Sequence, residues 1–309
     1  GSVYDNIGKY SKALDYYSKC VNIRQIALPD NHPDLVTSFS KLASVYYHIG
    51  EYAKALDYYN RCLNIRKVIR SDNHPDIATC YNNIGLVYDN IGEYSKALDY
   101  YTRSINMKTI ALPEYHPNLA NSYNNIGSVY RKINEYSKAL DYYKKSLTIL
   151  KIVLPENHPL LATSYNNIAL VYDNIGEYSK ALYYYDRCFL MQKITLPENH
   201  PHWASFYNNI SSVYRKTGEY YKAVECCIKS LNIQKRALPE NHPALATSYS
   251  NIGQVYNNIG EYSKALDYFK KGLEITKIAL PENHPDLATS YNNITLAYNN
   301  IGEYSKALD

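Results

Sequence analysis

The sequence predicts an all-α protein: a solenoid of stacked antiparallel helix pairs, built from about seven 42-residue repeats. Three observations predict this fold. A His-Pro pair recurs once in each repeat, each repeat holds two apolar series with helical spacing, and a glycine or asparagine separates the two series. Because the period covers almost the whole chain, we expect a single repeat domain over residues 1–309 with partial repeats at both ends. Gly1 and Ser2 lie outside the pattern, as a cloning scar would.

The His-Pro pair predicts where the first helix of each repeat begins. The histidines of these pairs are His32, His74, His116, His158, His200, His242 and His284. Proline is favoured in the first turn of a helix and keeps the preceding residue out of the helical conformation. We therefore expect Pro75 near the first helical position and His74 near the N-cap. A shared metal is not expected, because equivalent atoms of neighbouring helices lie about 8–10 Å apart and a zinc ligand lies ~2 Å from its ion.

Each repeat should contain two helices joined by a tight turn. In the repeat that begins at His74, the first series is Ile77, Ala78, Tyr81, Ile84, Gly85, Tyr88 and Ile91. The second series is Tyr94, Ala97, Leu98, Tyr101, Ser104 and Ile105. Gly92 lies between them, and its counterparts are Gly8, Gly50, Gly176, Gly218, Gly260 and Gly302, with Asn134 as the one exception. Glycine with asparagine as its substitute is typical of a left-handed helix C-terminus.

The composition argues against membrane and nucleic-acid partners. Charged residues make up 20% of the chain and the mean hydropathy is −0.45. No apolar run approaches the ~20 residues of a membrane span, and no signal peptide is visible. The net charge of +4 comes without a basic run, so we expect no nucleic acid.

The six cysteines do not form a disulfide pattern. Cys20, Cys62 and Cys188 occupy a repeat position that elsewhere holds serine or glycine, so the position needs a small side chain. Cys226 and Cys227 replace a Tyr-Tyr pair, and Cys80 replaces a serine. We interpret all six as reduced thiols and expect a cytoplasmic protein.

The residues within one repeat resemble a known family. The series Tyr81, Ile84, Gly85, Tyr88, Ala97, Tyr101 and Ser104 resembles the pattern of tetratricopeptide repeats, which are usually ~34 residues long. The 42-residue period, the HPD[LI]A start and the NN[IL][GA] segment look like the repeats of kinesin light chains, from Val3 onward. This resemblance implies a right-handed superhelix, and a non-enzymatic scaffold that binds extended peptide segments in its concave groove. The repeat type serves many proteins, so it does not specify the partner.

The candidate peptide-binding residues lie opposite the core series of the first helix. That face holds Thr79, Asn82, Asn83, Leu86, Asp89 and Asn90, and the resemblance implies that it lines the groove. The second asparagine recurs as Asn83, Asn125, Asn167, Asn209, Asn251 and Asn293, with Lys41 in the remaining repeat; the first recurs as Asn82, Asn124, Asn166 and Asn208. Kinesin light chains use asparagines at the second position to hold a peptide backbone, and a carboxamide offers both donors and acceptors for this. The alternative is a solvated surface copied by duplication.

Two positions on this face alternate over four consecutive repeats, and the next two repeats have Asn257-Asn258 and Asn299-Asn300 instead. The series is Asp89-Asn90, Arg131-Lys132, Asp173-Asn174 and Arg215-Lys216. Duplication of a pair of repeats explains the alternation. Duplication does not exclude a role in binding. In that role the acidic side chains of a ligand would face the basic residues Arg131, Lys132, Arg215 and Lys216. No lysine stands one turn before the groove asparagines, so a clamp for C-terminal carboxylates is not expected.

These features predict a binding protein rather than an enzyme. The sequence has no phosphate loop, no metal-ligand cluster and no nucleophile motif, so we expect no catalysis, cofactor or metal. Trp203, where other repeats have leucine or isoleucine, is interpreted as a local packing change. The alternative function is a structural or self-associating array within a larger signalling or motor-associated protein. Head-to-tail self-stacking is expected through uncapped apolar ends, at Tyr10, Leu14 and Tyr17 and at Ile294, Tyr298 and Leu308.

Overall fold

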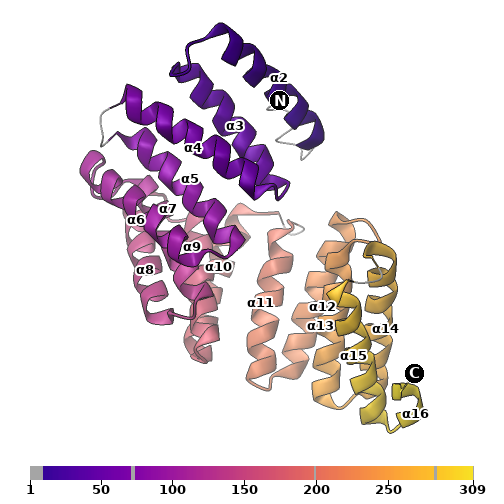
Figure 1. Ribbon diagram of the computed structural model, residues 1–309. Coiled ribbons are helices and arrows are strands. Elements are labelled where there is room, and N and C mark those ends of the chain that lie inside the picture. The colour runs from indigo at the N-terminus through magenta and orange to yellow at the C-terminus, as the bar shows by residue number, and fades with distance from the viewer. Residues whose placement is uncertain (1–9, 71–73, 198–199, 282–283, 309) are drawn as a thin grey trace. The chain divides into compact units, whose positions relative to one another are not determined.

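The structure is a computed structural model that describes residues 10–70, 74–197, 200–281 and 284–308, and its described secondary structure is helical (Figure 1). It divides into two compact halves, residues 1–156 and 157–309, which are described separately. The N-terminal half contains α2 (Tyr10–Ala27), α3 (Pro33–His48), α4 (Tyr52–Ile69), α5 (Pro75–Ile91), α6 (Tyr94–Ala111), α7 (Pro117–Lys132) and α8 (Tyr136–Val153). The C-terminal half contains α9 (Pro159–Asn174), α10 (Tyr178–Thr195), α11 (His202–Lys216), α12 (Tyr220–Ala237), α13 (Pro243–Ile259), α14 (Tyr262–Ala279), α15 (Pro285–Ile301) and α16 (Tyr304–Leu308).

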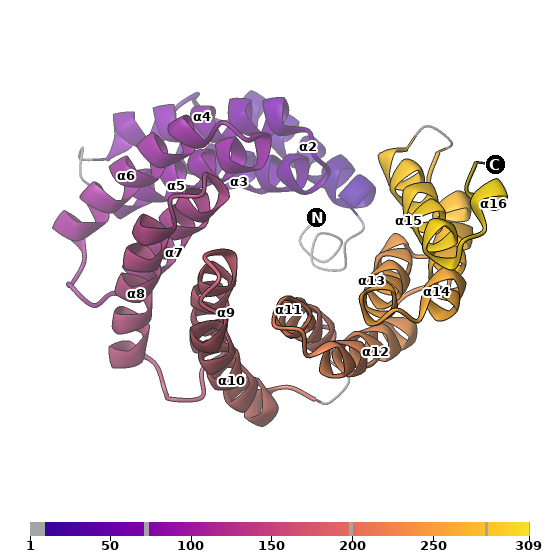
Figure 2. The same cartoon turned by 90° about the horizontal axis from the view of Figure 1, so that it is seen from below.

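The predicted array of antiparallel helix pairs in 42-residue repeats is confirmed. Odd-numbered helices are the first helices of each repeat and even-numbered helices are the second. Within the N-terminal half, α3, α5 and α7 form one layer and α4, α6 and α8 the other (Figures 1 and 2). Within the C-terminal half, the first helix α11 contacts α9 and α15 contacts α13, and the second helix α12 contacts both α11 and α13. The single domain over residues 1–309 and the right-handed superhelix stay predictions.

The His-Pro pairs begin the first helices, as predicted. His74 has an extended backbone and its Nδ1 accepts a hydrogen bond from the backbone N–H of Asp76 at 3.2 Å, which satisfies one of the unpaired donors of the helix start. The same bond forms at the six other histidines. In the repeat of His200 the helix begins one residue later, at His202.

The turns between the two helices of a repeat also follow the prediction. Gly92 has φ 89° and ends α5, and the N–H of Glu93 bonds the carbonyl of Tyr88 at 3.0 Å. Gly50, Gly176, Gly218, Gly260 and Gly302 share the positive φ, and Asn134 adopts it with φ 62°. Gly8 lies outside the described residues.

Small side chains allow the two helices of a repeat to pack closely. A Cβ added to Gly85 of α5 would lie 2.8 Å from a ring carbon of Tyr101 on α6, which is almost completely buried. The predicted need for a small side chain also holds at the position shared by Cys62, Ser104 and Ser230. Each of these side chains lies against the first helix of the same repeat and donates a hydrogen bond to a backbone carbonyl of that helix. The six cysteines carry free thiols.

The N-terminal end of the described array is less open than the sequence suggests. Tyr17, which the repeat pattern predicts to be exposed, is buried because α2 packs on α3. Tyr10 stacks on His48, with ring centroids 5.5 Å apart. Tyr291 and Tyr304 in the last described helices are exposed, and the side chain of Leu308 lies outside the described residues. Head-to-tail stacking stays a prediction.

Candidate functional site

The paired asparagines of the first helices form hydrogen bonds from one repeat to the next. The Nδ2 group of Asn125 on α7 donates to Oδ1 of Asn82 on α5 at 3.1 Å. In the C-terminal half, Asn209 on α11 donates in the same way to Asn166 on α9 at 3.2 Å. At these two junctions the second asparagine of one repeat donates to the first asparagine of the preceding repeat. We call the surface that carries these side chains the asparagine face.

The asparagine face retains hydrogen-bonding capacity after these bonds have formed. A carboxamide has two N–H donors and two acceptor lone pairs, and each bond uses one donor of one residue and one acceptor of the other. The predicted residues on this face are half-buried: Asn82, Asn83, Asn124, Asn125, Asn166, Asn167, Asn208, Asn209, Asn251 and Asn293. Oδ1 of Asn208 is buried without a hydrogen-bond partner. The two inter-repeat bonds fix the orientation of the amides of Asn82, Asn125, Asn166 and Asn209, and each bond uses only one donor or one acceptor of an amide.

Two small hollows open on the asparagine face of the C-terminal half. A cavity of about 170 Å³ between α9 and α11 is lined by Thr163, Asn166, Ser205 and Asn209, among others. A second, of about 220 Å³ between α13 and α15, is lined by Ser250, Asn251, Gln254 and Asn293, among others. Both are smaller than the 300–1,000 Å³ typical of sites for drug-sized ligands. Their size suits single side chains of a peptide rather than a cofactor.

The structure corrects the interpretation of the alternating charges. Lys132 Nζ lies 2.8 Å from Asp89 Oδ1 in the preceding repeat, and Lys216 lies at the same distance from Asp173. Both aspartates are buried, because the next first helix packs over them, and so they do not lie on an open face as the sequence pattern predicts. Lys132 and Lys216 are therefore each ion-paired to the preceding repeat, and their side chains remain 32% exposed. Their contact with an acidic ligand stays a prediction.

Arg131 and Arg215 occupy the alternate position without such a carboxylate partner among the ion pairs of the described residues. Both are half-buried. Burial raises the pKa of Tyr143, and Arg131, which hydrogen-bonds this tyrosine, opposes that shift. Arg215 lies near Cys227, whose pKa burial raises while the arginine charge opposes the shift. A guanidinium carries five N–H donors, so one contact leaves others for a ligand.

Sequence reasoning missed the connections between repeats, although a signal for them was present. The bonds join residues 43 positions apart, at Asn125 and Asn82 and at Lys132 and Asp89. In other repeats, neutral residues occupy the positions equivalent to Asp89 and Lys132. Asn90 donates to the Tyr47 hydroxyl and Asn300 donates to Asn257 Oδ1, each at 2.8 Å. A comparison of each residue with the one 43 positions later would have matched every Asp of the alternation with a Lys.

The described residues hold no group of three or more His, Cys, Asp or Glu side chains that could bind a metal ion. Among the helices of the same residues, none is long and apolar enough to cross a membrane.

Several solved structures are similar to this chain in fold. A putative kinesin light chain with nearly identical tetratricopeptide-like repeats from Podosopora anserina matches with a TM-score of 0.58 and 20% identity, over 67% of this chain and 99% of the other. BtubC from P. vanneervenii matches with a TM-score of 0.60 and 21% identity, over 77% and 92%. The apo form of RapI matches with a TM-score of 0.66 and 17% identity, over 90% and 95%. At these identities the likeness shows the fold alone.

Sequence comparison identifies the family. No curated protein matches the chain in sequence. One family model described as tetratricopeptide repeat matches residues 1–67, 34–110 and 204–278, and a second with the same description matches residues 119–160 and 161–202. These matches cover most of the chain with the period and the helix pairs seen in the structure, and the chain belongs to the tetratricopeptide repeat family.

Proposed function

We propose that this protein is a non-enzymatic interaction scaffold that binds extended peptide segments of partner proteins along its asparagine face. Tetratricopeptide repeats are in general protein–protein interaction modules, and the proposal assigns that role to one surface. The observation that carries it is the series of half-buried carboxamides on the first helices, four of which the Asn125–Asn82 and Asn209–Asn166 bonds hold in a fixed orientation.

The geometry of the amides favours a peptide backbone as the ligand. A main chain presents alternating N–H and C=O groups, and a carboxamide can pair with both without reading the side chains. Preorganised amides lose little conformational freedom on binding, which favours affinity. The hollows beside Asn209 and Asn251 could then accept side chains of the peptide.

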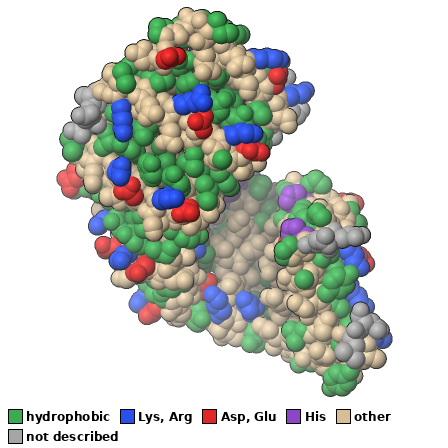
Figure 3. All heavy atoms as spheres, in the orientation of Figure 1, with side chains coloured by type: hydrophobic (Ala, Val, Ile, Leu, Met, Phe, Trp, Pro, Cys, Tyr) green, Lys and Arg blue, Asp and Glu red, His purple; other side chains and the backbone are tan. Residues whose placement is uncertain are grey.

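The preference for acidic peptides rests on fewer residues than the sequence suggested. Arg131 and Arg215 support it, and the ion-paired Lys132 and Lys216 do not. In the view of Figure 3, many Lys and Arg side chains lie beside Asp or Glu side chains. Lys54–Glu51 and Lys96–Glu93 are two of the exposed ion pairs. The two arginines could bias selection toward acidic residues, while the backbone contacts supply most of the affinity.

A structural array is the second candidate, and a specific observation favours it. The asparagines and the Asp–Lys pairs bond one repeat to the next, so their recurrence is explained by stability of the array without any ligand. In that case the asparagine face would bind no peptide in preference to other surfaces. The cytoplasmic location also stays a proposal, supported by the six free thiols.

Selection from a random library of displayed peptides, with the full chain as bait, separates the two candidates. The scaffold proposal predicts enriched peptides whose binding protects backbone amides of the first helices from hydrogen exchange. Enrichment of no sequence, or protection restricted to the second helices, would contradict it.

A further inference from the structure

One hollow of the asparagine face lies where the chain has a short side chain in place of a long one. The hollow between α13 and α15 has a volume of about 220 Å³, and we call it the α13–α15 hollow. Thr276 of α14 lines it, together with Asp286 and Ser290 of α15. Asn251 and Asn293 of the asparagine face line it as well. The equivalents of Thr276 in the other repeats are Arg24, Arg66, Lys108, Leu150, Gln192 and Gln234.

Arginine at this position reaches across to the next repeat. Nη1 of Arg24 donates to the backbone carbonyl of Asp34 at 2.9 Å and to Oγ of Ser38 at 2.7 Å. Nη1 of Arg66 donates to the backbone carbonyl of Asp76 at 2.6 Å. The start of the next first helix therefore offers acceptors that suit a guanidinium.

Lysine and glutamine at this position use the same hydroxyl. Lys108 Nζ donates to Ser122 Oγ at 2.7 Å, and Ser248 Oγ donates to Gln234 Oε1 at 2.6 Å. Burial lowers the pKa of Lys108 to about 8, because the charged amine loses its solvation. A guanidinium keeps its charge when it is buried, so the position suits arginine better than lysine.

The α13–α15 hollow keeps the acceptors of this junction. Ser290 donates to the carbonyl of Asp286 at 2.9 Å, as Ser38 does to that of Asp34 at 3.2 Å. Ser38 accepts a hydrogen bond from arginine at the same time, so the hydroxyl oxygen of Ser290 has the same capacity. Thr276 donates instead to a backbone carbonyl of its own helix at 2.9 Å. The space that a long side chain occupies elsewhere is therefore part of the hollow.

A second shortened side chain lies one helical turn away on α14. Gly272 occupies the position that holds Ser104 and Ser230 in other repeats. A Cβ added to Gly272 would lie 3.2 Å from the carbonyl oxygen of Ala246 and 3.2 Å from Oγ of Ser250. Both of these residues line the hollow. Side-chain volume is thus missing at two positions of α14 that face the same space.

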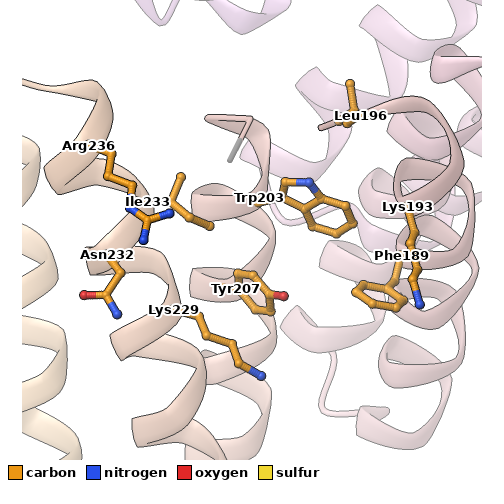
Figure 4. A pocket seen from close by; sticks show the side chains of 9 residues that line it. All are labelled: Phe189, Lys193, Leu196, Trp203, Tyr207, Lys229, Asn232, Ile233 and Arg236. Atoms are coloured by element: carbon orange, nitrogen blue, oxygen red, sulfur yellow. The ribbon is translucent and has the colours of Figure 1, made fainter. Parts of the chain in front are cut away.

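The cavity beside Trp203 has a different origin. It lies where α10, α11 and α12 meet, and its volume is about 350 Å³ (Figure 4). Trp203 replaces the leucine found at Leu161 and Leu245, and its indole N–H donates to the carbonyl of Pro197 at 3.0 Å. A larger side chain accompanies that cavity, whereas smaller side chains accompany the α13–α15 hollow.

The charge at the α13–α15 hollow suits a cation. Asp286 lines the hollow, and its side chain is 67% exposed. In both repeats that have arginine at the position of Thr276, an aspartate stands ten residues later, as Asp286 does here. Where Gln234 occupies the position, Ala244 stands there instead. This junction therefore has the aspartate of an arginine site but not the arginine.

We propose that the α13–α15 hollow binds the arginine side chain of an extended peptide, whose guanidinium donates to Ser290 Oγ and to the carbonyl of Asp286. The inference rests on the proposed function, because Asn251 and Asn293 beside the hollow would hold the backbone of that peptide. A guanidinium has five N–H donors, so it can bond both acceptors and still interact with the Asp286 carboxylate.

The test uses N-acetyl-arginine methylamide, titrated into the full chain and followed by calorimetry. The citrulline compound of the same design keeps the shape without the charge, and the norleucine compound keeps only the apolar stem. The expected result is saturable binding of the arginine compound, with a Kd at least ~10-fold lower than that of either matched probe, because hydrogen bonds from a charged donor are the stronger ones. The lysine compound should bind more weakly than the arginine compound.

The variants at Thr276 locate the site. Thr276→Gln installs the residue of the preceding repeat, where Gln234 bonds Ser248, and should fill the hollow and raise the Kd for the arginine compound at least ~10-fold. Thr276→Ser keeps a short side chain with a hydroxyl and is the matched control, which should bind as the wild type does. Circular dichroism checks that both variants fold.

The outcomes separate this inference from the proposed function. Library-selected peptides that carry arginine and lose affinity at least ~10-fold in Thr276→Gln would support both. Selected peptides that bind Thr276→Gln and the wild type equally well would overturn the arginine site and leave peptide binding in place. If no peptide is enriched while the arginine compound binds, a peptide is overturned as the source of the guanidinium. The site itself is overturned if the arginine compound binds no more tightly than the citrulline compound, or if folded Thr276→Gln binds it as the wild type does.

Discussion

Lys132 on α7 pairs with Asp89 on α5, one repeat earlier, with 2.8 Å between Nζ and Oδ1 and with the aspartate side chain only 8% exposed. Lys216 and Asp173 repeat this relationship in the C-terminal half. The alternation of charges between residues 89 and 216 therefore follows a pairing rule, in which an aspartate of one repeat pairs with the lysine 43 residues later. These pairs join adjacent repeats, so the sequence pattern contributes to the stability of the array.

The pairing rule predicts coupling between Asp89 and Lys132. Lys132→Asn should destabilise the protein by about 2 kcal/mol, less than the 3–5 kcal/mol of fully buried pairs, because Lys132 is 32% exposed. Adding Asp89→Asn recreates the neutral pair Asn257–Asn300 and should recover about 1 kcal/mol. Urea unfolding of the single and double variants measures the coupling.

The exposed pair Asp141–Lys145 is the control for that cycle, with side chains 71% and 54% exposed. Changing both of its members to Asn should show a coupling below ~0.5 kcal/mol. If the changes in unfolding free energy caused by the Asp89 and Lys132 substitutions were strictly additive, the predicted coupling between the two residues would be contradicted.

The buried amine of Lys108 predicts a dependence of stability on pH. Burial lowers its pKa from 10.5 to about 8. Between these two pKa values Lys108 binds a proton in the unfolded chain more often than in the folded one. The free energy of unfolding therefore rises with pH over this window. Below the window the burial of the charged amine destabilises the fold to its full extent. Lys108→Gln copies Gln234, which bonds Ser248, and should be more stable than the wild type near neutral pH. The advantage should shrink toward about pH 10, and thermal unfolding at both pH values checks this. A difference that is independent of pH would contradict it.

The turn at Asn134 predicts a local backbone effect. Its φ of 62° is left-handed, where a residue with a Cβ is strained by about 1–2 kcal/mol unless its side chain compensates. Asn134→Ala should therefore destabilise by about 1 kcal/mol, while Asn134→Gly, the residue of the other repeats, should be close to neutral. Denaturant midpoints of the two variants decide the matter, and equal losses would indicate that the Asn134–Tyr136 hydrogen bond dominates instead.

Much of the fold could be predicted from the sequence because each repeat obeys local rules. His74 and Pro75 fix a helix start, Gly92 fixes its end, and Ile84 and Tyr101 fill the core between the two helices. The candidate site was harder to predict, because it depends on side chains from different repeats. The sequence pattern places Asp89 on an open face since it lies opposite Ile84 on the helix, but the neighbouring helix covers it. For the cavity beside Trp203 the sequence indicates only a local packing change, because the residues that line it come from α10, α11 and α12.

The arginines of the asparagine face predict a selectivity effect. Arg215→Glu should disfavour peptides with acidic residues and favour basic ones, because the charge at one wall of the face is reversed. The effect should be larger at low salt, since the screening length grows as ionic strength falls. Lys216→Gln is not a suitable control, because it breaks the pair with Asp173. Arg187→Glu on the second helix α10 is suitable, since it is exposed and remote from the asparagine face. Equal peptide preferences of the Arg215 variant and the wild type would show that this arginine does not select ligands.

The most direct test of the proposed function is the titration of a selected peptide into the wild type and into the triple variant Asn209→Ala, Asn251→Ala and Asn293→Ala. A single backbone hydrogen bond contributes about 0.5–1.5 kcal/mol, so three losses together should weaken binding at least ~10-fold and up to ~1,000-fold. The matched control replaces Asn22, Asn64 and Asn106, three exposed asparagines of the second helices, and should bind as the wild type does. We predict a large loss of affinity in the first variant alone, with helicity unchanged in both. Equal affinities of the wild type and the triple variant would contradict peptide binding at the asparagine face and leave the structural array as the function.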